Sequence, residues 1–283
     1  MKNEPQSESA TAAFQVDESV RLLPQICPHD NGHSHAGQHS EEEGGLFGVV
    51  LVANWPPKES LMKPYKEFVL QIKEQEWFEK DDLEQQKGSE EKNRIPAVYF
   101  YPPQALHITI ATFKAFNAPE VKHRDDYAEA CRRIVHKSFA REDWPSGPFQ
   151  IEIDRVHIGI KAGILLWENP DGAIASMREI MREEYDAYYK VNPGALDHRD
   201  LKVPNIIHTT FIRFAHSPKS SRAAVSERFL KASINPKNMF GKISVDSVRL
   251  AIERIPYMHI PCNERHVLAS SLEPLLNIAM ENT

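Results

Sequence analysis

The chain is poor in cysteine, and the cysteines it has are widely separated. Its 283 residues include only Cys27, Cys131 and Cys262. Three distant cysteines match neither a disulfide framework nor a zinc-binding spacing, and they suit a reducing compartment. We therefore expect a cytoplasmic protein, with the nucleus as the alternative location.

Long apolar runs are also missing. No uninterrupted apolar segment approaches the roughly 18–20 residues that a membrane-spanning helix needs. The first nine residues are polar and lack the apolar core of a signal peptide. Glu4 and Glu8 count against a transit peptide as well. We expect no membrane partner.

An excess of positive charge is the third absence. The chain has 34 Lys and Arg against 40 Asp and Glu, which gives a net charge of −6. Proteins that clamp long duplex DNA are usually basic, because neutralised phosphates supply most of the affinity. That class of partner is not expected. A nucleotide, a short oligonucleotide or an RNA end remains compatible with this charge.

Two common phosphate-handling signatures are absent too. The sequence has no Gly-x-x-x-x-Gly-Lys-Ser/Thr loop, so ATP use through such a loop is not expected. It also has no Asp-x-Asp cluster beside the motifs described next that would hold Mg²⁺. We expect no cofactor and no metal.

A short pattern of histidine and threonine occurs twice, although the chain has only six threonines. His107 and Thr109 lie two residues apart in an apolar run, and His208 and Thr210 repeat the spacing. In a β-strand, residues i and i+2 point to the same face. Two such strands brought together would surround one small anion with two imidazoles and two hydroxyls.

This group of side chains suits acid–base chemistry on a phosphate. Histidine changes its charge near neutral pH, so one imidazole can accept a proton from water while the other donates one to the leaving oxygen. Threonine hydroxyls can donate hydrogen bonds to the other phosphate oxygens. We therefore predict that His107 and His208 are catalytic and that Thr109 and Thr210 bind phosphate. The sequence leaves open which histidine is the base.

Three aromatic residues flank the first motif. Tyr99, Tyr101 and Phe113 could stack on a nucleobase, since every base has a π-face. The alternative is that they pack in the core or cover the groove. We name them as candidate base-stacking residues.

The polar composition of residues 1–45 predicts a disordered tail. The tail contains His29, His33, His35 and His39, and a histidine-rich tract can bind metal. The main domain is predicted over residues 46–254, with a charged insertion at 79–94, and a C-terminal extension follows at 255–283.

Hydrophobic periodicity within the main domain predicts an α+β fold with two similar halves. Helices would lie outside, and the two motif strands would lie side by side at a pseudo-twofold axis. Ser217 and Pro218 read as the N-cap and first residue of the last predicted helix. Strands are predicted at 46–53, 97–101, 106–113, 149–154, 163–167, 206–214 and 248–253, and helices near 65–72, 127–139, 174–185 and 217–229.

The paired His-x-Thr strands resemble the 2H phosphoesterase superfamily. Its members include 2′,3′-cyclic nucleotide phosphodiesterases, RNA 2′,5′ ligase-like proteins, 2′,5′-oligonucleotide phosphodiesterases and an RNA 3′-end trimming enzyme. The resemblance covers residues 46–253. The first motif fits fully, whereas Thr209 replaces the inner apolar residue of the second.

The resemblance implies bilobal, pseudo-twofold antiparallel sheets around a central groove, and hydrolysis without a metal. It also implies a phosphate-binding role for Arg213, because members often carry arginine at that place. On strict alternation Arg213 would face away from His208 and Thr210, and only a bulge or a strand end would bring it round.

Three hypotheses follow. The first is a metal-independent phosphodiesterase that hydrolyses a cyclic phosphate, or a 2′,5′ or 3′ phosphodiester, of a nucleotide or RNA end. The second is a non-catalytic module that binds nucleotide or RNA on the same fold. The third is a metal-buffering protein built on the histidine-rich tail. We expect a monomer.

Overall fold

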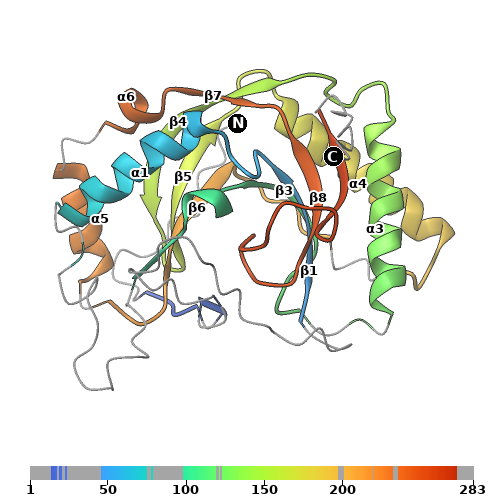
Figure 1. Cartoon of the computed structure of the whole chain (residues 1–283), viewed down its shortest axis with the longest axis horizontal. Coiled ribbons are helices and arrows are strands. Elements are labelled where there is room, and N and C mark those ends of the chain that lie inside the picture. The colour runs from blue at the N-terminus through green and yellow to red at the C-terminus, as the bar shows by residue number, and fades with distance from the viewer. Residues whose placement is uncertain are drawn as a thin grey trace, which may run out of the picture.

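The computed structural model describes residues 14–17, 19–20, 23, 46–74, 78, 98–118, 121, 123–196, 201–218, 220–231 and 235–272. They form an α+β fold with two antiparallel sheets and helices outside them (Figure 1). No helix in these ranges is long and apolar enough to cross a membrane.

The first sheet is built around β1 (Gly48–Ala53), every residue of which is buried. A strand covered on both faces needs apolar residues at successive positions, and Val49 to Ala53 provide them. β1 pairs antiparallel with a strand on each side. The sheet order is β3 (Ile108–Lys114), β1, β8 (Val248–Glu253) and β9 (Val267–Ser271).

The second sheet has five strands and carries the second motif in an inner strand. Along β4, Phe149, Ile151 and Ile153 are buried while the residues between them are more exposed, as their alternation predicts. The sheet order is β2 (Val98–Phe100), β6 (His208–Phe214), β5 (Ala162–Glu168), β4 (Phe149–Ile158) and β7 (Lys242–Val245).

The helices lie at two ends of the molecule (Figure 1). On one side, Phe68 packs edge-on against Phe211 and Phe240, with ring centroids 5.2 and 5.5 Å apart. On the other side, α3 packs against α4 and β9. The helices are α1 (Glu59–Glu74), α3 (Arg124–Phe139), α4 (Ala173–Val191), α5 (Arg222–Lys231) and α6 (Pro236–Phe240), and η2 (Pro103–Ala105) is a 3₁₀ turn.

The predicted start of the last long helix is wrong. α5 begins at Arg222 instead of Pro218. Ser221 caps it, because its hydroxyl accepts a hydrogen bond from the Ala224 amide at 3.2 Å and its carbonyl accepts one from Val225. Ser217 was therefore not the capping serine, although both serines precede a helix-compatible segment.

The two predicted halves correspond to two antiparallel sheets, each with one motif strand, but the sheets do not follow the order of the chain. The first sheet joins β1 and β3 to the two C-terminal strands, and β2 crosses to pair with β6 in the second sheet. The motif strands therefore lie in different sheets. They are linked through the segment before β6, since Thr112 and Lys202 exchange two backbone hydrogen bonds of 2.8 Å.

Part of the predicted N-terminal tail is packed against the domain. Phe14 is buried, and its ring centroid lies 4.2 Å from that of Phe214. The amides of Gln15 and Asp17 donate hydrogen bonds to the carbonyls of Ile160 (2.8 Å) and Phe214 (2.7 Å). These residues depart from the prediction of a disordered tail through residue 45. The four tail histidines, the insertion at 79–94 and residues 273–283 lie outside the described residues.

Candidate active site

A β-bulge in the first motif strand turns a third polar side chain toward the motif face. His107 precedes β3, and Thr109 lies within it. The pairing of β3 with β1 skips a residue between Thr109 and Ala111. A bulge of this kind shifts the alternation by one residue. Thr112 therefore lines the same cavity as His107 and Thr109.

The second motif strand repeats this irregularity. The pairing of β6 with β5 skips a residue between Thr210 and Ile212. The shift brings Arg213 to the face of His208 and Thr210, and all three line the cavity. Thr112 and Arg213 each lie five residues after their motif histidine. The two strands therefore share this irregularity, and β3 has a second one between Thr112 and Lys114.

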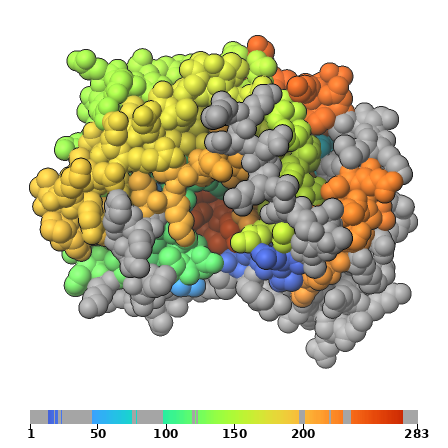
Figure 2. Space-filling model, turned by 180° about the vertical axis from the view of Figure 1, so that it is seen from behind, coloured from blue at the N-terminus to red at the C-terminus, as the bar shows by residue number. Residues whose placement is uncertain are grey.

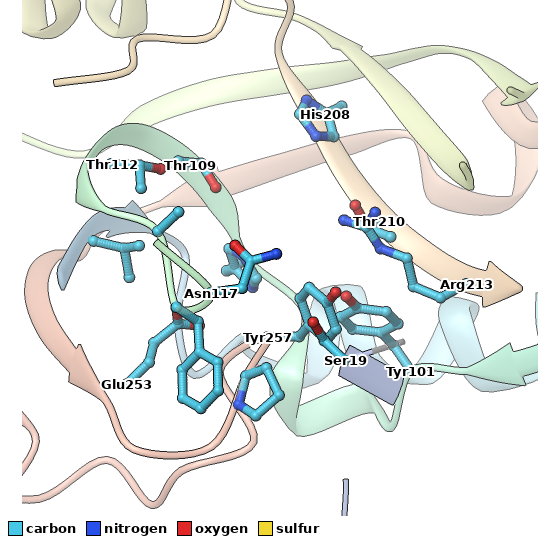
Figure 3. A pocket seen from close by; sticks show the side chains of 15 residues that line it. Ser19, Tyr101, Thr109, Thr112, Asn117, His208, Thr210, Arg213, Glu253 and Tyr257 are labelled. Atoms are coloured by element: carbon cyan, nitrogen blue, oxygen red, sulfur yellow. The ribbon is translucent and has the colours of Figure 1, made fainter. Parts of the chain in front are cut away.

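Both motifs contribute to one cavity of about 270 Å³. In Figure 3 the labelled Thr109 and Thr112 lie on one side, while His208, Thr210 and Arg213 lie on the β6 side. Figure 2 shows a hollow in the face of the molecule that is turned toward the viewer there, with the N-terminal segment, coloured blue, at its rim. The remaining lining residues are Ser19, Val50, Tyr101, Ala115, Phe116, Asn117, Glu253, Pro256 and Tyr257.

His107 is held in one orientation by a backbone carbonyl. Its Nδ1 lies 2.8 Å from the carbonyl oxygen of Ala105, so Nδ1 donates and Nε2 is left for the cavity. Burial lowers the pKa of His107 to about 4. The Ala105 carbonyl opposes this shift, whereas the nearby imidazole of His259 and the cation of Arg213 add to it. His107 is therefore neutral at pH 7.

His208 has a similar electrostatic environment. Burial lowers its pKa to about 4, and the nearby imidazole of His107 and the cations of Arg213 and Arg178 add to the shift. The nearby carbonyl of Ile206 opposes this shift. The buried Nδ1 atom of His208 nevertheless has no hydrogen-bond partner among the described residues. The effect of His107 on His208 means that protonation of one imidazole disfavours protonation of the other.

Arg178 joins the two motif segments. Its Nη2 donates to the carbonyl of Thr109 at 2.9 Å and to the carbonyl of Ile206 at 3.0 Å. The side chain comes from α4 and is 6% exposed, and burial lowers its pKa to about 10, with a contribution from Arg182. It therefore stays protonated at neutral pH. The sequence held a signal for this residue, because Arg178 stands four residues after Ile174 on the apolar face of the helix.

Arg213 is held by a carboxylate and two tyrosines. Its Nη1 lies 3.4 Å from Oδ2 of Asp17. Its guanidinium lies 4.9 Å from the ring centroid of Tyr257 and interacts with the hydroxyl of Tyr101. Sequence reasoning missed Asp17 and Tyr257, because neither lies near a motif in the chain.

Thr209, the residue that departs from the motif pattern, points away from the cavity. It is 1% exposed, and its hydroxyl accepts a hydrogen bond of 3.0 Å from the indole Nε1 of Trp167. An apolar residue there would leave that buried N–H without this acceptor. The threonine is therefore explained by its neighbour in the second sheet.

The three candidate stacking residues lie in different places. Tyr101 lines the cavity. The ring centroid of Tyr99 lies 5.9 Å from that of Tyr101. Phe113 is fully buried and packs against Tyr185 with ring centroids 6.2 Å apart. The structure does not bring Phe113 to the cavity, so it has no free face for a base.

His259 is a neighbour of the site that the sequence did not single out. Its Nδ1 lies 3.0 Å from the Pro256 carbonyl and must donate to it, so Nε2 accepts the hydroxyl of Tyr99 at 2.6 Å. Burial lowers the pKa of His259 to about 4. Both ring nitrogens are used, which makes His259 a neutral support for Tyr99.

Glu253 adds a buried acid to the cavity wall. Its Oε1 accepts the Met258 amide at 2.8 Å, and burial raises the pKa of the carboxyl to about 7. Its charge therefore changes near neutral pH. No group of three or more His, Cys, Asp or Glu suited to a metal ion occurs within the described ranges.

No protein-family model and no curated protein matches the chain. Similar solved structures include the conserved protein of unknown function ATU0111 from Agrobacterium tumefaciens str. C58, at 12% identity and a TM-score of 0.43, over 80% of this chain and 90% of that one. TT0787 from Thermus thermophilus has 12% identity and a TM-score of 0.38, over 72% and 87% of the two chains.

Usb1 from Kluyveromyces marxianus, solved with uridine monophosphate, has 10% identity and a TM-score of 0.43, over 74% of this chain and 95% of that one. At these identities and TM-scores the similarities establish neither a family nor a function for the chain.

Proposed function

We propose that the protein is a phosphodiesterase of the 2H phosphoesterase type, acting without a metal on a cyclic phosphate or a 2′,5′ or 3′ phosphodiester of a nucleotide or RNA end. The observation that supports this most is the meeting of two His-x-Thr segments, each with the same bulge, at one cavity. We assign the activity to residues 46–254, with a contribution from the packed part of the N-terminal segment.

The proposed roles follow from the geometry. The Nε2 of His107 and the imidazole of His208 exchange protons with the attacking water and the leaving ribose oxygen. Thr109, Thr210 and Arg213 hold the phosphate oxygens on which charge develops. Because Nδ1 of His107 is bound to Ala105, only its Nε2 takes part.

The low pKa values of the two histidines fit this scheme. One histidine must be protonated for acid catalysis, whereas burial keeps both neutral at pH 7. A bound phosphate anion favours imidazolium nearby and raises the pKa of an adjacent histidine. The substrate would then bring one histidine into its acid form, and the coupling between the imidazoles would keep the other neutral.

A substrate screen tests the proposal. The candidates are 2′,3′-cyclic nucleotides, ADP-ribose cyclic phosphate and 2′,5′-linked oligoadenylate, incubated with EDTA and resolved by chromatography. We expect hydrolysis of at least one ester. His107→Asn and His208→Asn should each reduce kcat by about two orders of magnitude or more without unfolding the protein.

His123→Asn is the matched control, because His123 is exposed at the start of α3 and its side chain makes no capping bond. Turnover retained in both motif variants would contradict the assignment. Tight nucleotide binding with no product from any ester would favour the second hypothesis, a non-catalytic binding module.

A further inference from the structure

A carboxylate from the N-terminal segment lies directly behind the proposed phosphate-binding arginine. Oδ2 of Asp17 is 3.4 Å from Nη1 of Arg213 and accepts the hydroxyl of Tyr257 at 2.5 Å. The amide of Ser19 donates to Oδ1 at 3.1 Å. Both carboxylate oxygens have partners, and the Asp17 side chain is only 16% exposed, so the negative charge is fixed in position.

The segment that carries Asp17 is bound to the strand that carries the second motif. The Asp17 amide donates to the carbonyl of Phe214, and Phe14 packs on the ring of the same residue. Two residues further on, Ser19 reaches the cavity and lines it (Figure 3). Asp17 is therefore fixed next to Arg213 and Tyr257, which line the cavity, and is not a loose surface charge.

This arrangement reduces the positive charge at the phosphate end of the cavity, although the protonated Arg178 also lies near His208. Among the described lining residues, Arg213 is the one permanently charged cation, and the carboxylate of Asp17 opposes it. The other titratable groups around Arg213 are Tyr101 and Tyr257, whose pKa values are raised by burial, and the two motif histidines, which are neutral at pH 7. Glu253 adds a second acid to the wall.

We propose that Asp17 is a specificity-determining residue that makes the site prefer a singly charged phosphodiester over a doubly charged terminal phosphate. The inference rests on the proposed function of the cavity. A fixed negative charge repels a dianion twice as strongly as a monoanion at the same distance. A terminal phosphate takes its second charge above a pKa of about 6, so Asp17 also favours release of the monoester product.

The experiment compares two ligands that differ in this charge. They are 2′-deoxyadenosine 3′-phosphate and its methyl ester, whose missing 2′-hydroxyl prevents cyclisation. Binding is measured by calorimetry at pH 8 and pH 5 for the full chain and for Asp17→Asn, which keeps an oxygen to accept the Tyr257 hydroxyl. At pH 8 the variant should gain about tenfold more affinity for the monoester than for the diester.

At pH 5 both ligands carry one charge, so this extra gain should largely disappear. Asp143→Asn is the control, because Asp143 is exposed and pairs with Arg141 away from the cavity. It should leave the ratio of the two affinities unchanged. An equal change for both ligands at pH 8 in Asp17→Asn would overturn the inference.

A measurement on Glu253→Gln keeps the test valid if Asp17→Asn does not fold, because this variant removes the cavity-lining acid that ionises between the two pH values. In Glu253→Gln the ratio of monoester to diester affinity should fall about tenfold between pH 5 and pH 8, and a flat ratio overturns the inference. Neither measurement requires turnover. A chain that hydrolyses no ester but shows the charge preference would refute the proposed function and support the role of Asp17.

Discussion

The Nδ1 atom of His107 lies 2.8 Å from the carbonyl oxygen of Ala105, two residues earlier in the chain. This contact depends on the 3₁₀ turn η2, which begins at Pro103 and ends at Ala105, two residues before His107. The turn therefore selects the tautomer of the first motif histidine and presents Nε2 to the cavity. Local backbone geometry prepares the side chain for proton transfer before any ligand binds.

The buried motif histidines should make the protein less stable in weak acid. Their pKa values are about 4 when folded, against 6.5 for an unperturbed histidine. Below pH 6.5 these histidines bind protons in the unfolded chain but not in the folded one. The free energy of unfolding therefore decreases as the pH falls from 6.5 to about 4. The expected loss between pH 7 and pH 5 is about 2 kcal/mol per histidine.

Urea unfolding of the natural chain and of His208→Gln at the two pH values measures this loss. The variant should lose less stability between pH 7 and pH 5 than the natural protein does. An identical pH dependence for both proteins would show that His208 is not buried in its neutral form.

Glu253 should have the opposite influence on stability. Its folded pKa of about 7 lies above its ordinary value of 4.5. Its contribution is therefore present below pH 4.5 and is lost as the pH rises to about 7. Glu253→Gln, which can still accept the Met258 amide, should be more stable than the natural chain at pH 8 by roughly 2–3 kcal/mol, as measured by urea unfolding.

Glu142→Gln is the control for that measurement, because Glu142 is exposed. It should change stability at pH 8 by only a few tenths of a kcal/mol, roughly. A Glu253→Gln variant that is less stable than the natural chain at pH 8 would show that the charged carboxylate of Glu253 does not destabilise the fold.

Arg178 should maintain the distance between the two histidines. Arg178→Met removes both hydrogen bonds that join Thr109 to Ile206. We expect a stability loss of about 2–4 kcal/mol, a larger fall in kcat than rise in KM, and a higher pKa of His208, because a nearby cation is gone. Urea unfolding, steady-state kinetics and an NMR titration of His208 measure the three effects.

Arg178→Lys should restore part of the activity, since it keeps a positive donor at this place. Arg182→Met, one turn further along α4 and exposed, provides the control and should change kcat and KM little. An unchanged pKa of His208 in Arg178→Met would contradict the electrostatic part of this account.

The two adjacent threonines should separate catalysis from stability. Thr210→Val removes a cavity hydroxyl and should lower kcat by about tenfold to a hundredfold, with little change in stability. Thr209→Val removes the acceptor of the Trp167 indole and should cost about 1–3 kcal/mol with little change in kcat. Steady-state kinetics and urea unfolding of the two variants measure these effects. A fall in kcat for Thr209→Val together with a loss of stability for Thr210→Val would contradict the two roles.

Helices and strands could be predicted where the spacing of apolar residues within the segment itself determines them. The buried run of β1 and the apolar stripe of α4 follow from the spacing of their own residues. The pairing of β1 with β8 joins segments about two hundred residues apart, and the spacing of apolar residues carries no information on such pairing. The sequence therefore predicted two halves but not which strands make up each sheet.

The site shows the same limit. His107, Thr109, His208 and Thr210 were found from a spacing of two residues, and the structure places all four at one cavity. Arg213 required a bulge, which is determined by the pairing of β6 with β5 and not by β6 alone.

Asp17 was hidden for a different reason. The segment around it is anchored by Phe14 and by backbone hydrogen bonds, which leave no periodic signal in the sequence. Its composition therefore predicted a disordered tail. A charge that contacts the site from such a segment becomes visible only when the fold is known.

The most direct test of the central claim is a crystal structure with 2′- or 3′-adenosine monophosphate bound. The account predicts one phosphate in the cavity, with oxygens within about 3.2 Å of Nε2 of His107 and of an imidazole nitrogen of His208, and with Thr109, Thr210 and Arg213 on the remaining oxygens. A phosphate that binds elsewhere while the cavity stays empty, or that touches only one of the two histidines, would contradict it.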